Sequence, residues 1–222
     1  TLAPEVEGGL DRIRALRAHH VVVSLGHTDA SYEQLVQGID AGATMATHLY
    51  SAMSGFHHRA PGATGAALLD ERLVVGLIAD GIHCHPASFR LALRAKGPDG
   101  VALVTDAMAG AGMPPGVYRL DGQDVVVDST AARLRDGTLA GSVLTLDQAV
   151  RNVADWTGSG AAEACRMASE VPARLLGLRT KGRLAAGFDA DLVLLDGSLR
   201  VQATFREGRR IYSRNARVLD SP

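Results

Sequence analysis

Cysteine and long apolar runs are both scarce in this chain. Only Cys84 and Cys165 occur among 222 residues, too few for the disulfide framework that stabilises many secreted domains. We therefore expect a reducing compartment, with the cytoplasm as the default. No uninterrupted apolar stretch approaches the roughly 20 residues of a membrane-spanning helix, and the N-terminus lacks a signal-peptide pattern. The sequence thus predicts no membrane partner.

An excess of charge of either sign is also absent. Lys and Arg total 23, Asp and Glu total 24, and the formal net charge is −1. Without a basic face, we expect no nucleic-acid partner. Near-neutrality does not exclude an anionic substrate, because one or two local Arg or His side chains can bind a phosphate. An apolar content of 46% argues against disorder and allows one sizeable core.

Apolar runs and helix-like segments alternate over the first half of the chain. This alternation predicts a parallel sheet in an α/β fold. One expected helix is capped by Asp29 and ended by Gly42, and residues 51–65, rich in Gly, Pro and His, predict a loop along an active site. The expected strands are residues 21–25, 43–47, 73–79 and 101–105, and the other expected helices are residues 6–20 and 86–96.

From Gly116 the pattern changes. Short strands joined by Asp-Gly turns predict a small β-meander, three helices follow, and the tail from Gly182 is rich in β-forming residues again. The expected strands are residues 117–120, 124–128 and 132–135, then 183–184, 191–195, 203–205 and 210–212; the expected helices begin near residues 145, 161 and 171.

The number of parallel strands is too small for a closed barrel. We count four or five, whereas a (β/α)8 barrel has eight. Half a barrel leaves two open edges and an uncovered core. We therefore expect either a preceding segment or a second copy of the chain to complete it.

Polar residues follow the expected strands where each strand ends, which is where the chemistry of such barrels collects. His27 and His48 suit Zn²⁺, which needs about three protein ligands and an open position for water. A third ligand must come from elsewhere. The alternative is that both are ordinary strand-end histidines with satisfied hydrogen bonds.

Asp106 follows the last of these strands. A carboxylate near a metal-bound water can take its proton and later donate it to a leaving amine. The alternative is a buried aspartate that caps the next segment. On the strand before, His83 is suited to polarise a carbonyl or hold a hydroxyl, while Asp80 is better suited to the backbone turn.

Two further segments are candidates for substrate contacts. Arg59 offers a bidentate fork to phosphate and His58 adds a donor, although a solvated loop charge is the common fate of such an arginine. The Gly-rich residues 138–142 precede a helix and can bring backbone N–H groups close to a ligand. They lack the spacing of a nucleotide-binding loop.

Taken in order, these motifs resemble the N-acetylglucosamine-6-phosphate deacetylases, a family within the amidohydrolase superfamily. Single motifs are weak signals, but the ordered set is specific and covers the whole chain. The similar segments are residues 1–5, 26–30, 46–53, 57–62, 78–83, 103–107, 139–142 and 182–192.

The resemblance implies a fold and a reaction. The fold is α/β, a partial (β/α)8 TIM-type barrel made of the C-terminal strands (residues 1–181) with part of a small β-sandwich domain (residues 182–222). The reaction is hydrolysis of the N-acetyl group of an amino-sugar 6-phosphate by metal-activated water. The implied metal is divalent, with zinc first and iron, cobalt or manganese as alternatives. A homo-oligomer, most simply a dimer, is also implied.

The resemblance also implies roles for single residues. His27 and His48 are implied metal ligands, Asp106 the general base and acid, and Arg59 with His58 the 6-phosphate site, shared across a dimer interface. His83 is placed near the acetamide. The implied lining of the sugar pocket is Ser51, Ala52, Asp80, Gly81, Ile82, Leu139, Ala140 and Gly141.

Two departures from the family pattern keep alternatives open. Residue 51 is Ser where the family usually has Asn, and the family's N-terminal half, which supplies a glutamate ligand, has no counterpart here. The alternatives are an inactive fragment that acts only as an assembly partner, a deacetylase of another N-acetylhexosamine phosphate, and a cyclic amidase of the dihydroorotase type.

Overall fold

Short runs of apolar residues form the central sheet of the computed structural model, which describes residues 1–214. The strands are parallel and lie in chain order, as the alternating pattern predicts. Leu2 adds a single parallel bridge to Leu25, so the first residues lie along the outer edge of the sheet. The strands are β1 (Ser24–Leu25), β2 (Met45–Ala46), β3 (Val74–Ile78) and β4 (Val101–Val104).

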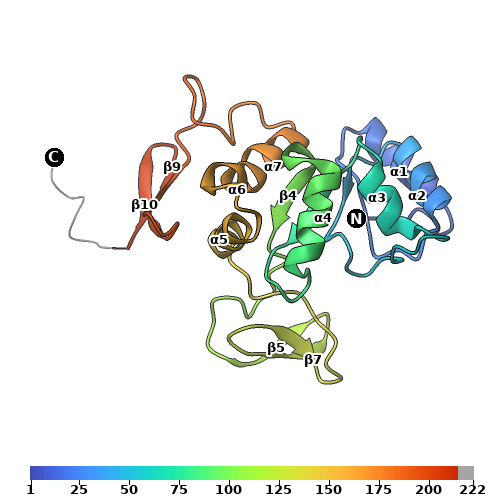
Figure 1. The fold of residues 1–222 in the computed structure, drawn as a ribbon, viewed down its shortest axis with the longest axis horizontal. Helices are drawn as coiled ribbons and strands as arrows, with labels where there is room; N and C mark the ends of the chain where they lie inside the picture. Colours follow the sequence, from blue (N-terminus) through green and yellow to red (C-terminus); the bar gives the residue numbers. More distant parts are fainter. Residues whose placement is uncertain (215–222) are drawn as a thin grey trace.

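One helix precedes β1, the others connect successive strands, and together they cover the sheet (Figure 1). Helix α2 begins two residues later than predicted, because the capping residue is Ser31 and not Asp29. The Ser31 hydroxyl accepts from the N–H of Gln34, and the Gln34 side chain accepts from the N–H of Ser31, a capping box. The helices are α1 (Gly9–Ala18), α2 (Tyr32–Asp40), α3 (Gly62–Leu69) and α4 (Pro86–Lys96).

Helix α3 lies partly inside residues 51–65, which the sequence predicted as a loop, so that prediction was wrong at its C-terminal end. The helix consists of small and apolar residues, and all but its last residue are buried. Because no polar face exists, the sequence carries no helical periodicity there. Its two glycines are also poor helix formers by themselves, so tertiary packing must stabilise the helix.

The main core lies between the sheet and its helices. Ile13, Leu77 and Phe89 are among its fully buried side chains. Helices α5 (Leu146–Thr157), α6 (Ala161–Ala168) and α7 (Glu170–Leu175) follow the meander and pack beside β4, near a short 3-10 turn, η1 (Pro98–Gly100). No helix within residues 1–214 is long and apolar enough to cross a membrane.

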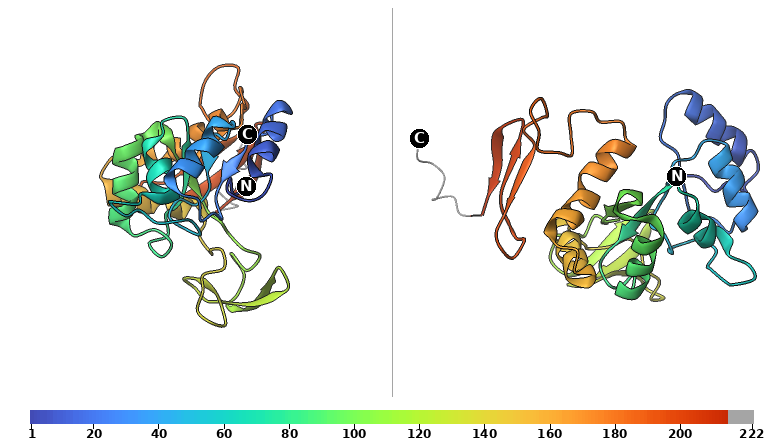
Figure 2. Two further views of the ribbon diagram at one scale, coloured as in Figure 1. Left: turned by 90° about the vertical axis from the view of Figure 1, so that its right-hand side faces the viewer. Right: turned by 45° about the horizontal axis from the view of Figure 1, so that its top comes forward.

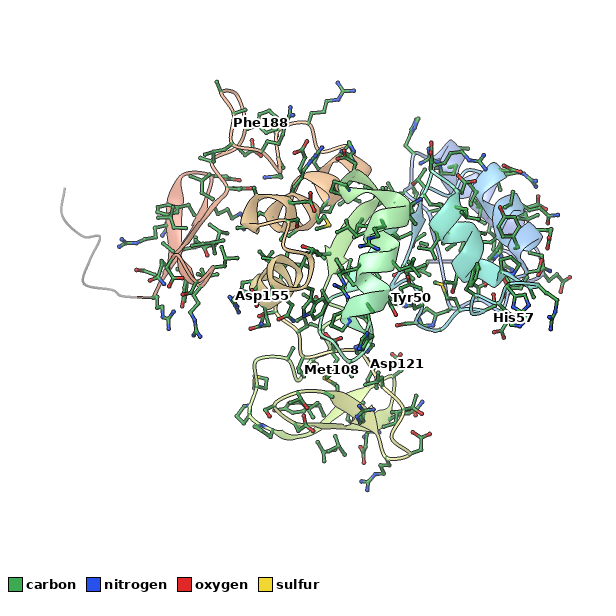
Figure 3. The ribbon with its side chains drawn as sticks, in the orientation of Figure 1. Tyr50, His57, Met108, Asp121, Asp155 and Phe188 are labelled. Atoms are coloured by element: carbon green, nitrogen blue, oxygen red, sulfur yellow. The ribbon has the colours of Figure 1, made fainter. Side chains whose placement is uncertain are left out.

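The predicted β-meander is present and stands apart from the central sheet (Figure 1). Asp121 and Gly122 form the predicted turn between its first two strands, but the second connection is a turn in which the Asp128 carboxylate accepts backbone N–H groups. A small core centred on Met108 lies where the meander meets the strand ends (Figure 3). The strands are β5 (Gly116–Leu120), β6 (Gln123–Val127) and β7 (Ala132–Leu134).

The tail forms a separate antiparallel sheet, which Figure 2 shows away from helices α1 to α4. The expected strand at residues 183–184 is irregular chain instead. Arg151 of α5 donates to the carbonyl of Leu199 at 2.9 Å and so ties the tail to the helices. The domain boundary at residue 182 stays a prediction. The last eight residues of the predicted C-terminal domain, 215–222, lie outside the described residues. The strands are β8 (Leu192–Leu195), β9 (Val201–Arg206) and β10 (Arg209–Ser213).

Candidate active site

Each strand of the central sheet is followed by a polar residue at the same offset. His27, His48, Asp80 and Asp106 each lie two positions beyond the last residue of β1, β2, β3 and β4, respectively. The strands are parallel and in register, so these four residues stand along the carboxyl edge of one sheet. That edge is where ligands bind in barrels of this type.

His27 and His48 meet at this edge. Their Nε2 atoms are 2.9 Å apart, and the rings are arranged edge to face. The Nδ1 atom of His48 lies 3.1 Å from the carbonyl of Ser51, so Nδ1 carries the proton and Nε2 keeps its lone pair. His48 is only 7% exposed, whereas His27 is open to solvent. The pair is therefore buried on the side of His48 and open to solvent on the side of His27.

This arrangement suits two ligands of one metal ion. Two nitrogens at the usual distance from a tetrahedral zinc lie about 3.3 Å apart, close to the separation found here. The carbonyl partner on His48 is the kind of second contact that orients metal-binding imidazoles. However, no group of three or more His, Cys, Asp or Glu side chains within residues 1–214 is placed to hold a metal. The described residues thus fit two ligands of a site that needs about three.

The backbone is unusual at these same positions. The φ angles are 50° at His27, 28° at His48 and 51° at Asp106, all in the left-handed region. Residues other than glycine adopt this region uncommonly, and such strain clusters at functional sites. The three residues to which sequence reasoning gave metal and acid–base roles therefore share a costly conformation.

Asp80 and His83 form a buried pair after β3. Their side chains are 9% and 8% exposed, and Nδ1 of His83 lies 2.6 Å from Oδ2 of Asp80. Burial raises the pKa of Asp80, but the His83 side chain and the backbone N–H groups of Ile82 and His83 together hold that pKa below its usual value. Asp80 thus serves the turn, as expected, and also fixes the ring of His83.

Asp106 is exposed, so the alternative of a buried capping aspartate is wrong. Its carboxylate makes no hydrogen bond or ion pair with any described residue. The backbone around it is held tightly: Ser142 donates its N–H to the Asp106 carbonyl at 2.7 Å and accepts from Met108. This places the predicted lining residues 139–141 directly beside Asp106. At Gly141, with φ at 70°, a Cβ atom would lie 3.0 Å from the Asp106 carbonyl.

The predicted anion site lies on the long loop after β2. Nη1 of Arg59 and Nε2 of His58 are 3.0 Å apart, and both side chains are exposed. Figure 3 shows the neighbouring His57 at the outer end of this part of the molecule, well away from Met108. The two residues are therefore brought together, while their role stays a prediction.

Other residues hold the site, and sequence reasoning gave them no role. Asn152 of α5 donates to the carbonyl of Ala79 at 2.7 Å and supports the turn that carries Asp80. Ser54 accepts from the N–H of Ala63 at 2.7 Å and anchors the long loop to α3. Glu5 binds the turn after His27. Single polar residues follow no periodic pattern, whether they lie in a loop or on a helix, so only a three-dimensional structure reveals these partners.

Comparison with known proteins identifies several relatives of this chain. The N-acetylglucosamine-6-phosphate deacetylase of Lysinibacillus sphaericus is 44% identical over 97% of this chain and 56% of its own length. The N-acetylgalactosamine-6-phosphate deacetylase of Escherichia coli O157:H7 is 46% identical over 94% and 55%, respectively. A mutant N-acetyl-D-glucosamine-6-phosphate deacetylase from Mycobacterium smegmatis, solved in complex with N-acetyl-D-glucosamine-6-phosphate, superimposes with a TM-score of 0.90 at 43% identity, covering 94% of this chain and 56% of that one.

The similarity is confined to one part of these proteins. The chain spans about half the length of the curated relatives it matches. The predicted α/β fold is confirmed, and the barrel it contributes to is partial. A model of the amidohydrolase family matches residues 15–212, most of the chain. On this evidence the chain belongs to the amidohydrolase family.

Proposed function

We propose that this chain is the C-terminal part of a deacetylase that hydrolyses N-acetylglucosamine 6-phosphate to glucosamine 6-phosphate and acetate, a step of amino-sugar catabolism in the cytoplasm. The observation that carries the proposal is the histidine pair, with Nε2 atoms 2.9 Å apart, at the same sheet edge as Asp106. The names of the relatives and of the solved structure support the choice of substrate.

In this proposal His27 and His48 hold a divalent metal through their Nε2 atoms. Zinc is the first candidate, with iron, cobalt and manganese as alternatives. The metal supplies a Lewis acid that makes water a stronger nucleophile and polarises the amide carbonyl. The carbonyl of Ser51 keeps His48 in the required tautomer.

Asp106 moves the proton. Its carboxylate is exposed and unpaired within the described chain, so it is free to accept a proton from the attacking water. A C–O bond then forms at the acetyl carbon, and the C–N bond breaks once Asp106 returns the proton to the leaving amine. The products are one acetate and one free amino sugar.

His83 and the neighbouring loops bind the sugar. Because Nδ1 of His83 is engaged by Asp80, Nε2 is the atom offered to the acetamide or a hydroxyl. Ser51, Ala52, Gly81 and Ile82, together with residues 139–141, line the pocket. Arg59 and His58 bind the 6-phosphate, and in a homodimer they serve the partner's site.

Acetate release from N-acetylglucosamine 6-phosphate with added Zn²⁺ tests the proposal. We expect release by the chain and a loss of about a hundred- to ten-thousand-fold in Asp106→Asn, because this is the usual contribution of a general acid and base. Circular dichroism and zinc content should stay unchanged. Full turnover by Asp106→Asn would contradict the mechanism.

Two other functions are distinguished by the same assay. A relative named for N-acetylgalactosamine 6-phosphate is 46% identical, so faster release from that epimer would favour it as substrate. If neither sugar yields acetate, the result would favour the alternative of an inactive chain that acts only as an assembly partner.

A further inference from the structure

Glu5 follows the N-terminal segment that pairs with β1, and its carboxylate accepts hydrogen bonds from the turn after His27. Oε2 accepts from the hydroxyl of Thr28, and Oε1 accepts from the N–H of Asp29 at 2.8 Å. Thr28 is only 4% exposed, and its hydroxyl also accepts from the N–H of Ala30 at 3.1 Å. The carboxylate therefore holds a turn that also contains a hydrogen bond of its own.

The same turn is bonded to the loop of the second histidine. Thr28 donates its N–H to the carbonyl of Ala52 at 3.0 Å and accepts from the N–H of Ser54 at 3.0 Å. The carbonyl next to Ala52, that of Ser51, is the partner of Nδ1 of His48. A displacement of Thr28 is thus transmitted to both histidines.

His27 needs such support. Its φ of 50° is one that residues other than glycine keep only where the surroundings over-determine it. The side chain is exposed, so packing alone does not fix the ring. The hydrogen bonds of Glu5 to the Thr28 hydroxyl and the Asp29 N–H add side-chain restraints one and two residues after His27.

We propose that Glu5 is a positioning residue for the metal-binding histidine pair. Through Thr28 and Asp29 it holds Nε2 of His27 against Nε2 of His48, while its own carboxylate oxygens are both engaged and do not act as ligands. The inference rests on the proposed function, because the pair is taken to bind a metal.

The first test is zinc affinity, measured by competition with a chromophoric chelator on the full chain. We expect Glu5→Ala to lower the affinity ten- to a hundred-fold, the usual effect of losing an outer partner of a ligand. Glu5→Gln keeps one acceptor and should lose less. Glu7→Ala is the matched control, since Glu7 is exposed and makes no hydrogen bond or ion pair within residues 1–214; it should bind zinc like the wild type.

A metal-free readout separates this inference from the proposed function. Long-range ¹H–¹⁵N spectra report the imidazole signals of His27 and His48, which should shift in Glu5→Ala while those of His83 stay in place. Thr28→Val, which keeps the shape and removes the hydroxyl, should shift the same signals if Glu5→Ala does not fold.

The outcomes are distinct. Shifted His27 and His48 signals in Glu5→Ala, together with no zinc binding by the wild type, would support the positioning role and refute the metal part of the proposed function. Unshifted histidine signals in Glu5→Ala or Thr28→Val, or a zinc affinity within two-fold of the wild type, would overturn the inference.

Discussion

At the scale of single residues, hydrogen bonding decides which carboxylates are available for chemistry. Asp80 is buried and accepts from His83 and from two backbone N–H groups, so it acts as a fixed anion. Asp106 is exposed and has no such partner among residues 1–214, so its carboxylate is accessible to a ligand. Cys84 is inert by the same reasoning, because burial and then the charge of Asp80 raise the pKa of its thiol to about 12.

The lowered pKa of Asp80 predicts a pH-dependent stability. The folded state favours the ionised carboxylate, so the contribution is complete above the ordinary pKa of about 3.9 and is lost as the pH falls through the lower folded value. At pH 7, Asp80→Asn should reduce the free energy of unfolding by about 1–3 kcal/mol.

Urea unfolding at pH 7 and below pH 4 measures this effect. The difference in the free energy of unfolding between wild type and Asp80→Asn should be smaller below pH 4 than at pH 7. Asp155→Asn, at an exposed position without a partner in the described chain, is the control and should match the wild type. A gap that is constant with pH would refute the assignment.

Arg59 carries the second prediction at this scale. If it binds the 6-phosphate, Arg59→Ala should raise KM at least ten-fold for N-acetylglucosamine 6-phosphate and leave the unphosphorylated sugar unaffected. The matched control is Arg94→Ala, an exposed arginine in the last turn of α4, which should leave both values unchanged. An equal rise in KM for both sugars would remove the phosphate role and reopen the cyclic-amide alternative.

At the scale of elements, the close approach of β1 and β2 brings the histidines together. Gly26 follows β1, and a Cβ atom there would lie 2.4 Å from a methyl carbon of Thr47, the residue before His48. Real Cβ atoms do not come so near, so a side chain at position 26 requires that the Thr47 side chain or the strand ends move.

Gly26→Ala should therefore destabilise the chain by about 1–3 kcal/mol through overpacking and weaken zinc binding as well. Gly197→Ala is the control, because its added Cβ meets nothing within 4 Å and its φ is ordinary. Urea unfolding of both variants tests the effect; equal stability of Gly26→Ala and wild type would show that the strands are not tightly apposed.

Continuous apolar runs and clear helix starts were predictable, whereas a helix without a polar face was not. The four parallel strands are apolar runs, as a sheet buried on both faces requires, and Pro86 marks the start of helix α4. Helix α3 has no polar face and so carries no helical periodicity. The histidine pair could be predicted from strand ends, whereas Glu5 is a single polar residue in a loop whose partner is 23 positions away.

At the scale of the whole molecule, the chain is one part of an α/β barrel with two attached β-units (Figures 1 and 2). The sheet has four strands in one direction and supplies one edge of polar side chains. The chain spans about half the length of its relatives, so experiments on this chain test the residues at the sheet edge and not the closure of the barrel.

Cobalt binding most directly tests whether His27 and His48 bind a metal, because Co²⁺ replaces Zn²⁺ at histidine sites and its visible absorption reports the ligands. We predict one Co²⁺ per chain, with the affinity reduced at least ten-fold in His27→Ala and in His48→Ala. The loss of affinity in the double variant should not exceed the two single losses combined. His20→Ala, at an exposed histidine outside the site, should bind as the wild type does. Absence of cobalt binding by the wild type, or unchanged affinity in both single variants, would contradict the account.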